Sequence, residues 1–311
     1  MKKQTEKKSN KKIIIRVIGI ILIMVGLLLY GRFVSTTGLV IKEYKITNSN
    51  LPDTYHGLKI IHISDIHYGQ TIHSKEFNNM VEKINIIEPD IVVLTGDLFD
   101  RDVTLDNKQI DDLTKGLTKI KAKIGKYAII GNHDFNHTEW EEVITNGEFI
   151  NLNDNYDLIY SDGYEPILIS GMSTNLHGAK SVKDKLEVVD EFLNNTNDDE
   201  NEETEEQNEK NDSIINIQPD YKIMIMHEPD FIRDFDYSKY DLILAGHSHN
   251  GQVRIPFIGA VFLPEGAKKY YNEHYDLGNT DLFISSGTGT STMKFRFFNR
   301  PSINFYRLTN K

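Results

Sequence analysis

Apolar runs that end abruptly in polar residues recur along this chain of 311 residues. The first run covers residues 58–64, reads as a buried strand, and leads directly into Asp65 and His67. Further buried strands are expected over 91–95, 127–130, 167–170, 221–226 and 241–245. Apolar positions with helical spacing predict helices over 74–87, 105–121, 138–145 and 182–193. This alternation of strands and helices predicts an α/β fold with a mainly central sheet.

The two ends of this folded region differ from its middle. Residues 38–57 read as an extended lead-in, with alternating apolar positions followed by a proline and a glycine turn. The last part of the chain is rich in predicted strands, over 282–285, 295–298 and 303–308. We therefore expect one folded domain over residues 50–311.

The N-terminal part of the chain is typical of a membrane anchor. Residues 13–34 form a long apolar stretch that matches the roughly 20 residues needed to span a bilayer. The preceding residues 1–12 are rich in lysine, which favours a cytoplasmic N-terminus and places the body of the protein outside the cytoplasm. A cleaved signal peptide is the competing interpretation. Because no small-residue cleavage site follows the apolar stretch, we favour a single uncleaved transmembrane helix.

An acidic segment interrupts the domain at residues 194–218. Nine acidic side chains and a single lysine lie within 194–213, and no large apolar residue accompanies them. Such a segment cannot bury enough apolar surface to offset the entropy lost on ordering. We predict a disordered surface insertion there, because two further strands with polar ends follow it.

The cysteine content and the net charge exclude some kinds of site and of binding partner. The chain contains no cysteine, which excludes a disulfide framework and a zinc ribbon. The net charge is −11, and residues 1–16 carry seven basic side chains against one acid, so the remainder carries −17. An acidic body of this kind has no general attraction for nucleic acid. An anionic substrate would need a local positive charge, which bound metal ions can supply.

Polar clusters follow five of the predicted strands. Ligands of open α/β sheets bind outside the carboxyl ends of the strands, so these clusters should meet at one edge. The clusters are Asp65/His67, Asp97, Asn132/His133/Asp134, His227 and His247/His249. Their mixture of nitrogen and oxygen donors, without a thiolate, favours manganese, iron or zinc. The number of donors fits two divalent ions, an arrangement suited to in-line hydrolysis of phosphate esters.

These motifs resemble a known family. Asp65-x-His67, Gly96-Asp97, Gly131-Asn132-His133-Asp134, His227 and Gly246-His247-Ser248-His249 are similar, block by block and in order, to the signature of the calcineurin-like metallophosphoesterases. The resemblance covers roughly residues 58–251. Further similarity before the first strand and near residues 296–301 is to the membrane-associated bacterial branch, which includes lipid-directed pyrophosphatases and cell-envelope phosphodiesterases.

The resemblance implies a fold and a role for each motif residue. The fold would be a four-layer αββα sandwich. Asp65, His67 and His249 would hold a first metal ion, Asp97 would bridge two ions, and Asn132, His227 and His247 would hold the second. His133 would act as a general acid or stabilise the transition state. Asp134 would orient the ring of His133 and raise its pKa.

The expected function is metal-dependent hydrolysis of a phosphodiester or pyrophosphate, through a water activated between two metal ions, at the outer face of a bacterial membrane. The substrate would be a phosphate ester, with phospholipids and other cell-envelope components among the candidate classes. Two alternatives stay open: a serine/threonine protein phosphatase, and a non-catalytic binding protein with the same fold. Asp100-Arg101 has the spacing of the phosphatase motif, but Asp102 replaces its usual glycine. Oligomeric state is not indicated by the sequence.

Overall fold

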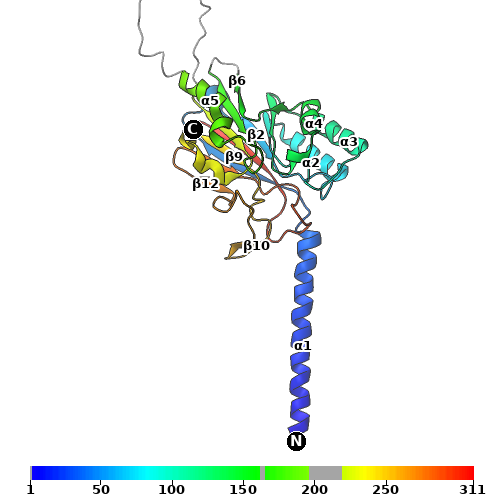
Figure 1. Ribbon diagram of the computed structural model, residues 1–311. Coiled ribbons are helices and arrows are strands. Elements are labelled where there is room, and N and C mark those ends of the chain that lie inside the picture. The colour runs from blue at the N-terminus through cyan, green and yellow to red at the C-terminus, as the bar shows by residue number, and fades with distance from the viewer. Residues whose placement is uncertain (1, 162–164, 196–218) are drawn as a thin grey trace, which may run out of the picture.

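The computed structural model describes residues 2–161, 165–195 and 219–311. Within these residues the chain forms two six-stranded sheets, with strand orders β1-β14-β2-β3-β4-β5 and β12-β13-β9-β8-β7-β6, and a two-stranded hairpin, β10-β11. Figure 1 shows the two sheets packed together, α2, α3 and α4 on one side, and α5 on the other. The four-layer αββα fold is therefore confirmed.

The first sheet is mixed. Its central strands β2 (Lys59–Ile63), β3 (Ile91–Thr95) and β4 (Gly125–Ile129) are parallel, and β4 continues to the short β5 (Ile150–Asn151). On the other side β14 (Ser302–Thr309) pairs antiparallel with β2, and β1 (Val40–Thr47) pairs parallel with β14. The domain was expected to begin at residue 50, but β1 adds residues 40–47 to its sheet.

The second sheet has a parallel centre as well. It contains β7 (Ile167–Met172), β8 (Lys222–Met226), β9 (Leu242–Ala245) and β13 (Asp281–Ile284), all parallel. Antiparallel strands β6 (Asn155–Ile159) and β12 (His274–Asp276) close its two edges. The remaining hairpin consists of β10 (Arg254–Ile255) and β11 (Gly259–Ala260).

Burial on both faces explains why the central strands read as unbroken apolar runs. In β3, Val92 and Leu94 pack toward the helices, whereas Ile91 and Val93 pack between the two sheets. The helices are α2 (Ser74–Ile87), α3 (Asn107–Thr118) and α4 (Trp140–Asn146) on the first sheet and α5 (Val182–Asn195) on the second. The predicted disordered insertion over 194–218 overlaps the end of α5, and 196–218 lie outside the described residues.

The N-terminal helix α1 (Lys2–Leu29) leaves the domain as a separate rod, and a π-helical turn at Tyr30–Val34 connects it to the domain (Figure 1). Residues Lys11–Val34 are long and apolar enough to cross a membrane, and their most apolar part is not buried against the domain. The end of the helix is packed on the domain: the Arg296 N–H donates to Gly31 O at 3.0 Å, and the Phe295 ring lies against Gly31.

One predicted strand is wrong. Residues 295–298 form a loop, and only Phe297 makes an isolated bridge, to Val253. The aromatic residues that predicted a strand instead pack on the end of the N-terminal helix: the Tyr30 ring centroid lies 5.9 Å from that of Phe297 and 6.1 Å from that of Phe298.

Candidate metal centre

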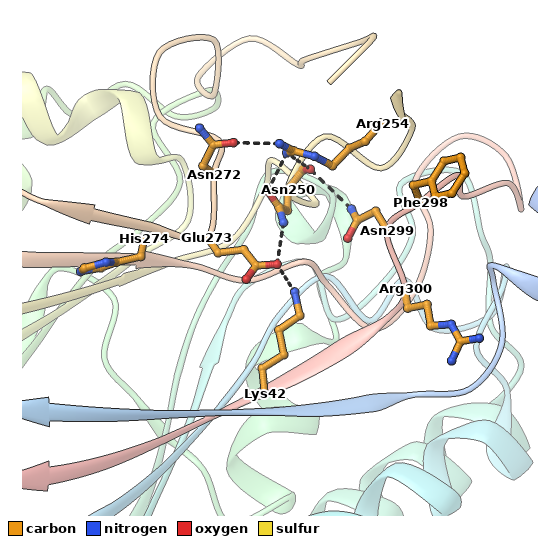
Figure 2. A pocket seen from close by; sticks show the side chains of 9 residues that line it. All are labelled: Lys42, Asn250, Arg254, Asn272, Glu273, His274, Phe298, Asn299 and Arg300. Carbon is orange, nitrogen blue, oxygen red and sulfur yellow. Dashed lines mark hydrogen bonds and ion pairs between the residues drawn. The ribbon is translucent and has the colours of Figure 1, made fainter. Parts of the chain in front are cut away.

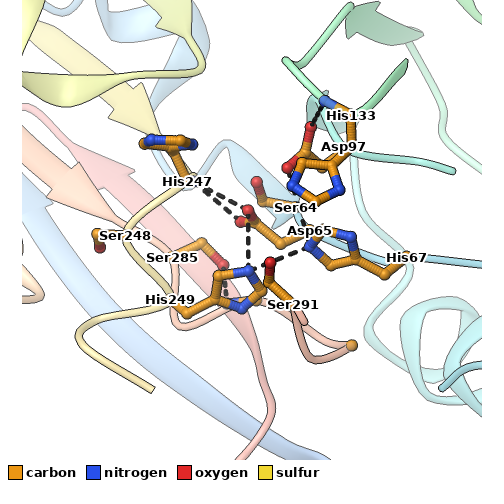
Figure 3. A network of polar contacts seen from close by, with 12 residues as sticks. Ser64, Asp65, His67, Asp97, His133, His247, Ser248, His249, Ser285 and Ser291 are labelled. Carbon is orange, nitrogen blue, oxygen red and sulfur yellow. Dashed lines mark hydrogen bonds and ion pairs between the residues drawn. The ribbon is translucent and has the colours of Figure 1, made fainter. Parts of the chain in front are cut away.

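The five predicted polar clusters all lie at carboxyl ends of strands. Three follow β2, β3 and β4 of the first sheet, and two follow β8 and β9 of the second sheet. The two sheets meet at this edge, where Nδ1 of His227 donates to Thr95 O at 2.6 Å. The structure therefore brings together residues separated by up to 184 positions in the sequence, as Figure 3 shows for most of them.

One group of possible ligands combines Asp65, His67 and His249, all buried. Their donor atoms face one another: Nε2 of His67 lies 3.1 Å from Nε2 of His249, and Nε2 of His249 lies 3.5 Å from Oδ1 of Asp65. The two imidazole rings stack with centroids 5.1 Å apart. Two ring nitrogens and a carboxylate within this space suit one divalent cation.

The second group combines Asp97, His227 and His247, also buried. Oδ2 of Asp97 lies 3.2 Å from Nε2 of His227, and Nε2 of His227 lies 3.1 Å from Oδ1 of Asn132. Asp97 also faces the first group, because the same Oδ2 lies 3.8 Å from Nε2 of His67. The position of Asp97 between the two groups is the geometry that a bridging carboxylate requires.

Hydrogen bonds outside the centre fix which nitrogen of two rings points inward. His227 donates through Nδ1 to Thr95 O, and His247 donates through Nε2 to Glu265 O at 2.6 Å. Each neutral ring is therefore left with a lone pair on its other nitrogen, as metal-binding histidines need. His67 directs Nε2 toward His249 and Asp97, and its Nδ1 lies 3.3 Å from Oδ2 of the buried Asp100. This donor set fits divalent metal ions.

Several of the predicted metal ligands have an unusual backbone conformation. Five of the seven predicted ligands have positive φ angles: Asp65, His67, Asp97, His247 and His249, with values between 48° and 64°. Such left-handed conformations are uncommon for residues other than glycine and cost of order 1–3 kcal/mol each. Such conformations persist where the surrounding packing imposes them. Here they occur directly after β2, β3 and β9, where the chain turns toward the metal-ligand groups.

The glycines of the motifs allow a close approach of the loops. A Cβ atom on Gly131 would lie 2.3 Å from both N and Oδ1 of Asp97. A Cβ atom on Gly246 would lie 2.0 Å from the Ser64 hydroxyl and 2.8 Å from Oδ2 of Asp65. Each glycine therefore makes room for a carboxylate that comes from a different strand.

The contacts of Asp134 differ from the predicted ones. Its carboxylate accepts hydrogen bonds from the N–H groups of Phe99 and Gly131, at 2.8 and 2.9 Å, and so joins two loops. Burial, followed by the charge of Asp97, raises the pKa of Asp134 to about 6. Within the described residues no contact joins the Asp134 carboxylate to the ring of His133, and the role of Asp134 in orienting that ring stays a prediction.

Asp100 occupies the position expected for Asp134. Its Oδ1 lies 3.9 Å from Nδ1 of His133, and its Oδ2 lies 3.3 Å from Nδ1 of His67. Burial lowers the pKa of His133, but the adjacent carboxylates of Asp100 and Asp97 outweigh burial and raise it above the usual value. Sequence reasoning missed this role, although Asp100 stands three residues after Asp97 at the end of the same apolar run.

The state of the His133 ring follows from two neighbours of Nδ1. The Arg101 N–H lies 3.2 Å from this nitrogen and can donate to it when the ring is neutral. A protonated ring would instead present Nδ1–H to Asp100. In both states Nε2 carries a proton, and the protonated ring can give this proton up as a general acid.

Comparison with known proteins decides the family. Residues 58–251, more than half of the chain, match the family described as calcineurin-like phosphoesterase. The chain belongs to the calcineurin-like metallophosphoesterase family. This assignment makes it a metal-dependent hydrolase of phosphate esters.

Similar metallophosphoesterases include membrane proteins. An uncharacterized metallophosphoesterase of Bacillus subtilis (strain 168), YkuE, is 26% identical over 283 residues, which cover 90% of this chain and 88% of that protein. A transmembrane protein with metallophosphoesterase domain from Bos taurus is 23% identical and covers 96% of this chain, which spans 63% of its length. Among solved structures, TT1561 of Thermus thermophilus aligns with a TM-score of 0.44 at 11% identity, over 75% of this chain and 90% of that one.

Proposed function

We propose that this metallophosphoesterase holds two divalent metal ions and hydrolyses a phosphodiester or a pyrophosphate. Asp65, His67 and His249 would hold the first ion, and Asn132, His227 and His247 the second. Asp97 would contact both ions. The observation that carries the proposal is the position of Asp97, whose Oδ2 faces His67 of one group and His227 of the other.

The metal ions and the side chains would have different tasks in the reaction. Manganese, iron or zinc at such a site would lower the pKa of a water molecule and hold phosphoryl oxygens. Among the side chains, His133 is placed to donate a proton to the leaving oxygen, since Asp100 supports its protonated form. His133 is only partly buried, so a substrate could reach it.

The proposed location is the outer face of a bacterial membrane, with a cytoplasmic N-terminus. The lysine-rich residues ahead of the Lys11–Val34 span support this orientation. The packing of Gly31 against Phe295 fixes the domain to the end of the span, so the substrate would be a membrane or cell-envelope phosphate ester, such as a phospholipid.

Substrate comparison tests the proposed reaction. The full chain, purified in detergent and supplied with manganese, would be assayed on bis(p-nitrophenyl) phosphate, p-nitrophenyl phosphate and a phosphopeptide. We expect turnover of the diester, abolished in Asp97→Asn and retained in Asp112→Asn, a surface control. Turnover of the phosphopeptide alone would identify a protein phosphatase. Absence of turnover with both metals bound would indicate a binding protein.

A further inference from the structure

Exposed apolar side chains of the domain gather around the β10–β11 hairpin. Outside residues 2–34, the described part of the chain exposes fourteen large hydrophobic side chains, and seven of them lie within 255–262 and 293–298. The hairpin contributes Ile255, Phe257, Ile258, Val261 and Phe262. Residues 255–262 contain no charged or polar side chain. Scattered exposed hydrophobic residues are normal, but a contiguous group marks an interaction surface.

The tip of the hairpin combines strain with full exposure. Ile258 N–H donates to Ile255 O at 3.1 Å, which closes a turn with Pro256 and Phe257 as its central residues. Phe257 has a φ of 68°, which this position of a type II turn requires and which glycine normally supplies. Its side chain is 109% exposed. An aromatic residue in a costly conformation, without any packing inside the domain, indicates a function for the tip.

The apolar surface of the hairpin extends to the end of the membrane anchor. Phe298, itself exposed, lies 6.1 Å from the Tyr30 ring at the end of the anchor. The same Phe298 lines a groove of about 440 Å³ together with Phe257 and Ile258. Phe298 therefore connects the anchor to the tip of the hairpin.

Hydrogen bonds hold the hairpin in this place. Arg254 N–H donates to Phe297 O at 2.9 Å, and Phe297 N–H donates to Gln252 O at 3.1 Å. The Arg254 guanidinium donates to Asn250 and Asn272, as Figure 2 shows at the adjoining pocket. The base of the hairpin is thereby fixed beside Asn250, the residue after His249 of the metal centre.

The direction of the hairpin identifies its partner. Figure 1 shows β10 projecting on the side of the domain from which α1 leaves, whereas α5 lies at the opposite end. Basic side chains border the apolar rim: Lys294 and Arg300 are exposed, and residues 282–311 contain no acidic side chain. An apolar tip with basic neighbours is typical of a segment that enters the headgroup region of a bilayer.

We propose that the β10–β11 hairpin inserts its tip into the same bilayer that the anchor spans. The protein then contacts the membrane at two places, the helix α1 and the hairpin, which carries Phe257 and Ile258 at its turn and is followed by the exposed Val261 and Phe262. Two contacts restrict rotation of the domain about the anchor and hold the loop that carries His249 close to the lipid surface. This inference concerns membrane contact alone, so it stands independently of the proposed phosphodiesterase reaction.

Tryptophan fluorescence with brominated lipids tests the insertion. The full chain would be reconstituted into vesicles of equimolar phosphatidylethanolamine and phosphatidylglycerol, with and without bromine on the acyl chains. The only native tryptophan, Trp140, is buried and supplies the background. Phe257→Trp should emit at shorter wavelength than an exposed tryptophan, and bromines near the headgroups should quench it. Phe262→Trp repeats the measurement just after β11.

The matched control is Val188→Trp, which replaces an exposed residue of α5 at the far end of the domain. Its emission should stay that of a tryptophan in water, without quenching by bromine. The proposal is overturned if both hairpin variants behave as this control does. It is also overturned if their emission is shifted but insensitive to bromolipid and dependent on protein concentration, because a second copy of the chain would then cover the hairpin.

Discussion

Single residues decide how the metal centre handles protons. His133 is the proposed proton donor, and the carboxylate beside it belongs to Asp100, whereas Asp134 holds two loops together through backbone hydrogen bonds. The two aspartates therefore make different contacts. Their substitutions should be distinguishable by different measurements.

Asp100→Asn should change the pH dependence of turnover. The folded-state pKa of His133 is raised, so the protonated donor is present below this pKa and is lost as pH rises through it. Removing the charge of Asp100 lowers that pKa, and the alkaline fall in kcat should begin at lower pH. The measurement is a pH–rate profile on bis(p-nitrophenyl) phosphate. Asp134→Asn is the comparison variant: it should lower thermal stability and leave the alkaline fall in kcat at the same pH. An unchanged alkaline fall in Asp100→Asn would contradict the role of Asp100 in raising the pKa of His133.

His62 supplies a second prediction at this scale. It is fully buried between Tyr306 and Thr95, and burial lowers its pKa to about 3. The folded protein cannot bind a proton there until about pH 3, whereas the unfolded chain does so near 6.5. This contribution to stability is present above pH 6.5 and is lost as pH falls below it. Between pH 7 and 5, the loss amounts to about 2 kcal/mol.

His62→Gln should remove this part of the acid sensitivity. Urea unfolding of both proteins at pH 7 and pH 5 gives the two changes in the free energy of unfolding. The variant should lose less stability than the wild type on acidification, whatever its stability at pH 7. Equal losses in the two proteins would show that His62 accepts a proton in the folded state.

Secondary structure elements explain why the centre is so closely packed. Strand ends from two sheets converge, and motif glycines leave the space that the carboxylates fill. Gly131→Ala should therefore displace Asp97, because its Cβ would lie 2.3 Å from Asp97 atoms. We expect a destabilisation of about 1–3 kcal/mol and a reduced metal content, measured by thermal unfolding and elemental analysis.

Gly278→Ala is the matched control for this substitution. A Cβ at Gly278 would meet no atom within 4 Å, although Gly278 has a positive φ of 94°, which Gly131 does not have. The control should show the backbone cost alone, about 1–2 kcal/mol, and bind metal as the wild type does. Equal metal content in Gly131→Ala and wild type would contradict the close-packing argument.

The helices and strands also show which parts of the fold can be predicted from the sequence. The central strands and α2 were predictable because burial on both faces of a strand, or on one face of a helix, leaves a clear pattern. The meeting of their polar ends followed from the rule for parallel strands. The loop at 295–298 was mistaken for a strand, because aromatic residues that pack on a helix end resemble strand residues in sequence. Asp100 was missed because its partner, His133, is defined only in three dimensions.

The proposed membrane attachment concerns the whole molecule. With Lys11–Val34 across the bilayer, the packing of Gly31 on the domain would hold the body at one membrane face. If the orientation is as proposed, protease added to intact cells should digest the domain, and a cytoplasmic control protein should stay intact. Protection of the domain until the cells are permeabilised would exclude the outer face.

The central claim is that one centre, with Asp97 between its two halves, holds two metal ions. The most direct measurement is the number of metal ions bound per full-length chain, after manganese is loaded and free metal is removed. We predict two ions in the wild type and fewer than two in both Asp97→Asn and His249→Ala, with two retained in the surface control Asp112→Asn. Two ions in Asp97→Asn, or one in the wild type, would contradict the account.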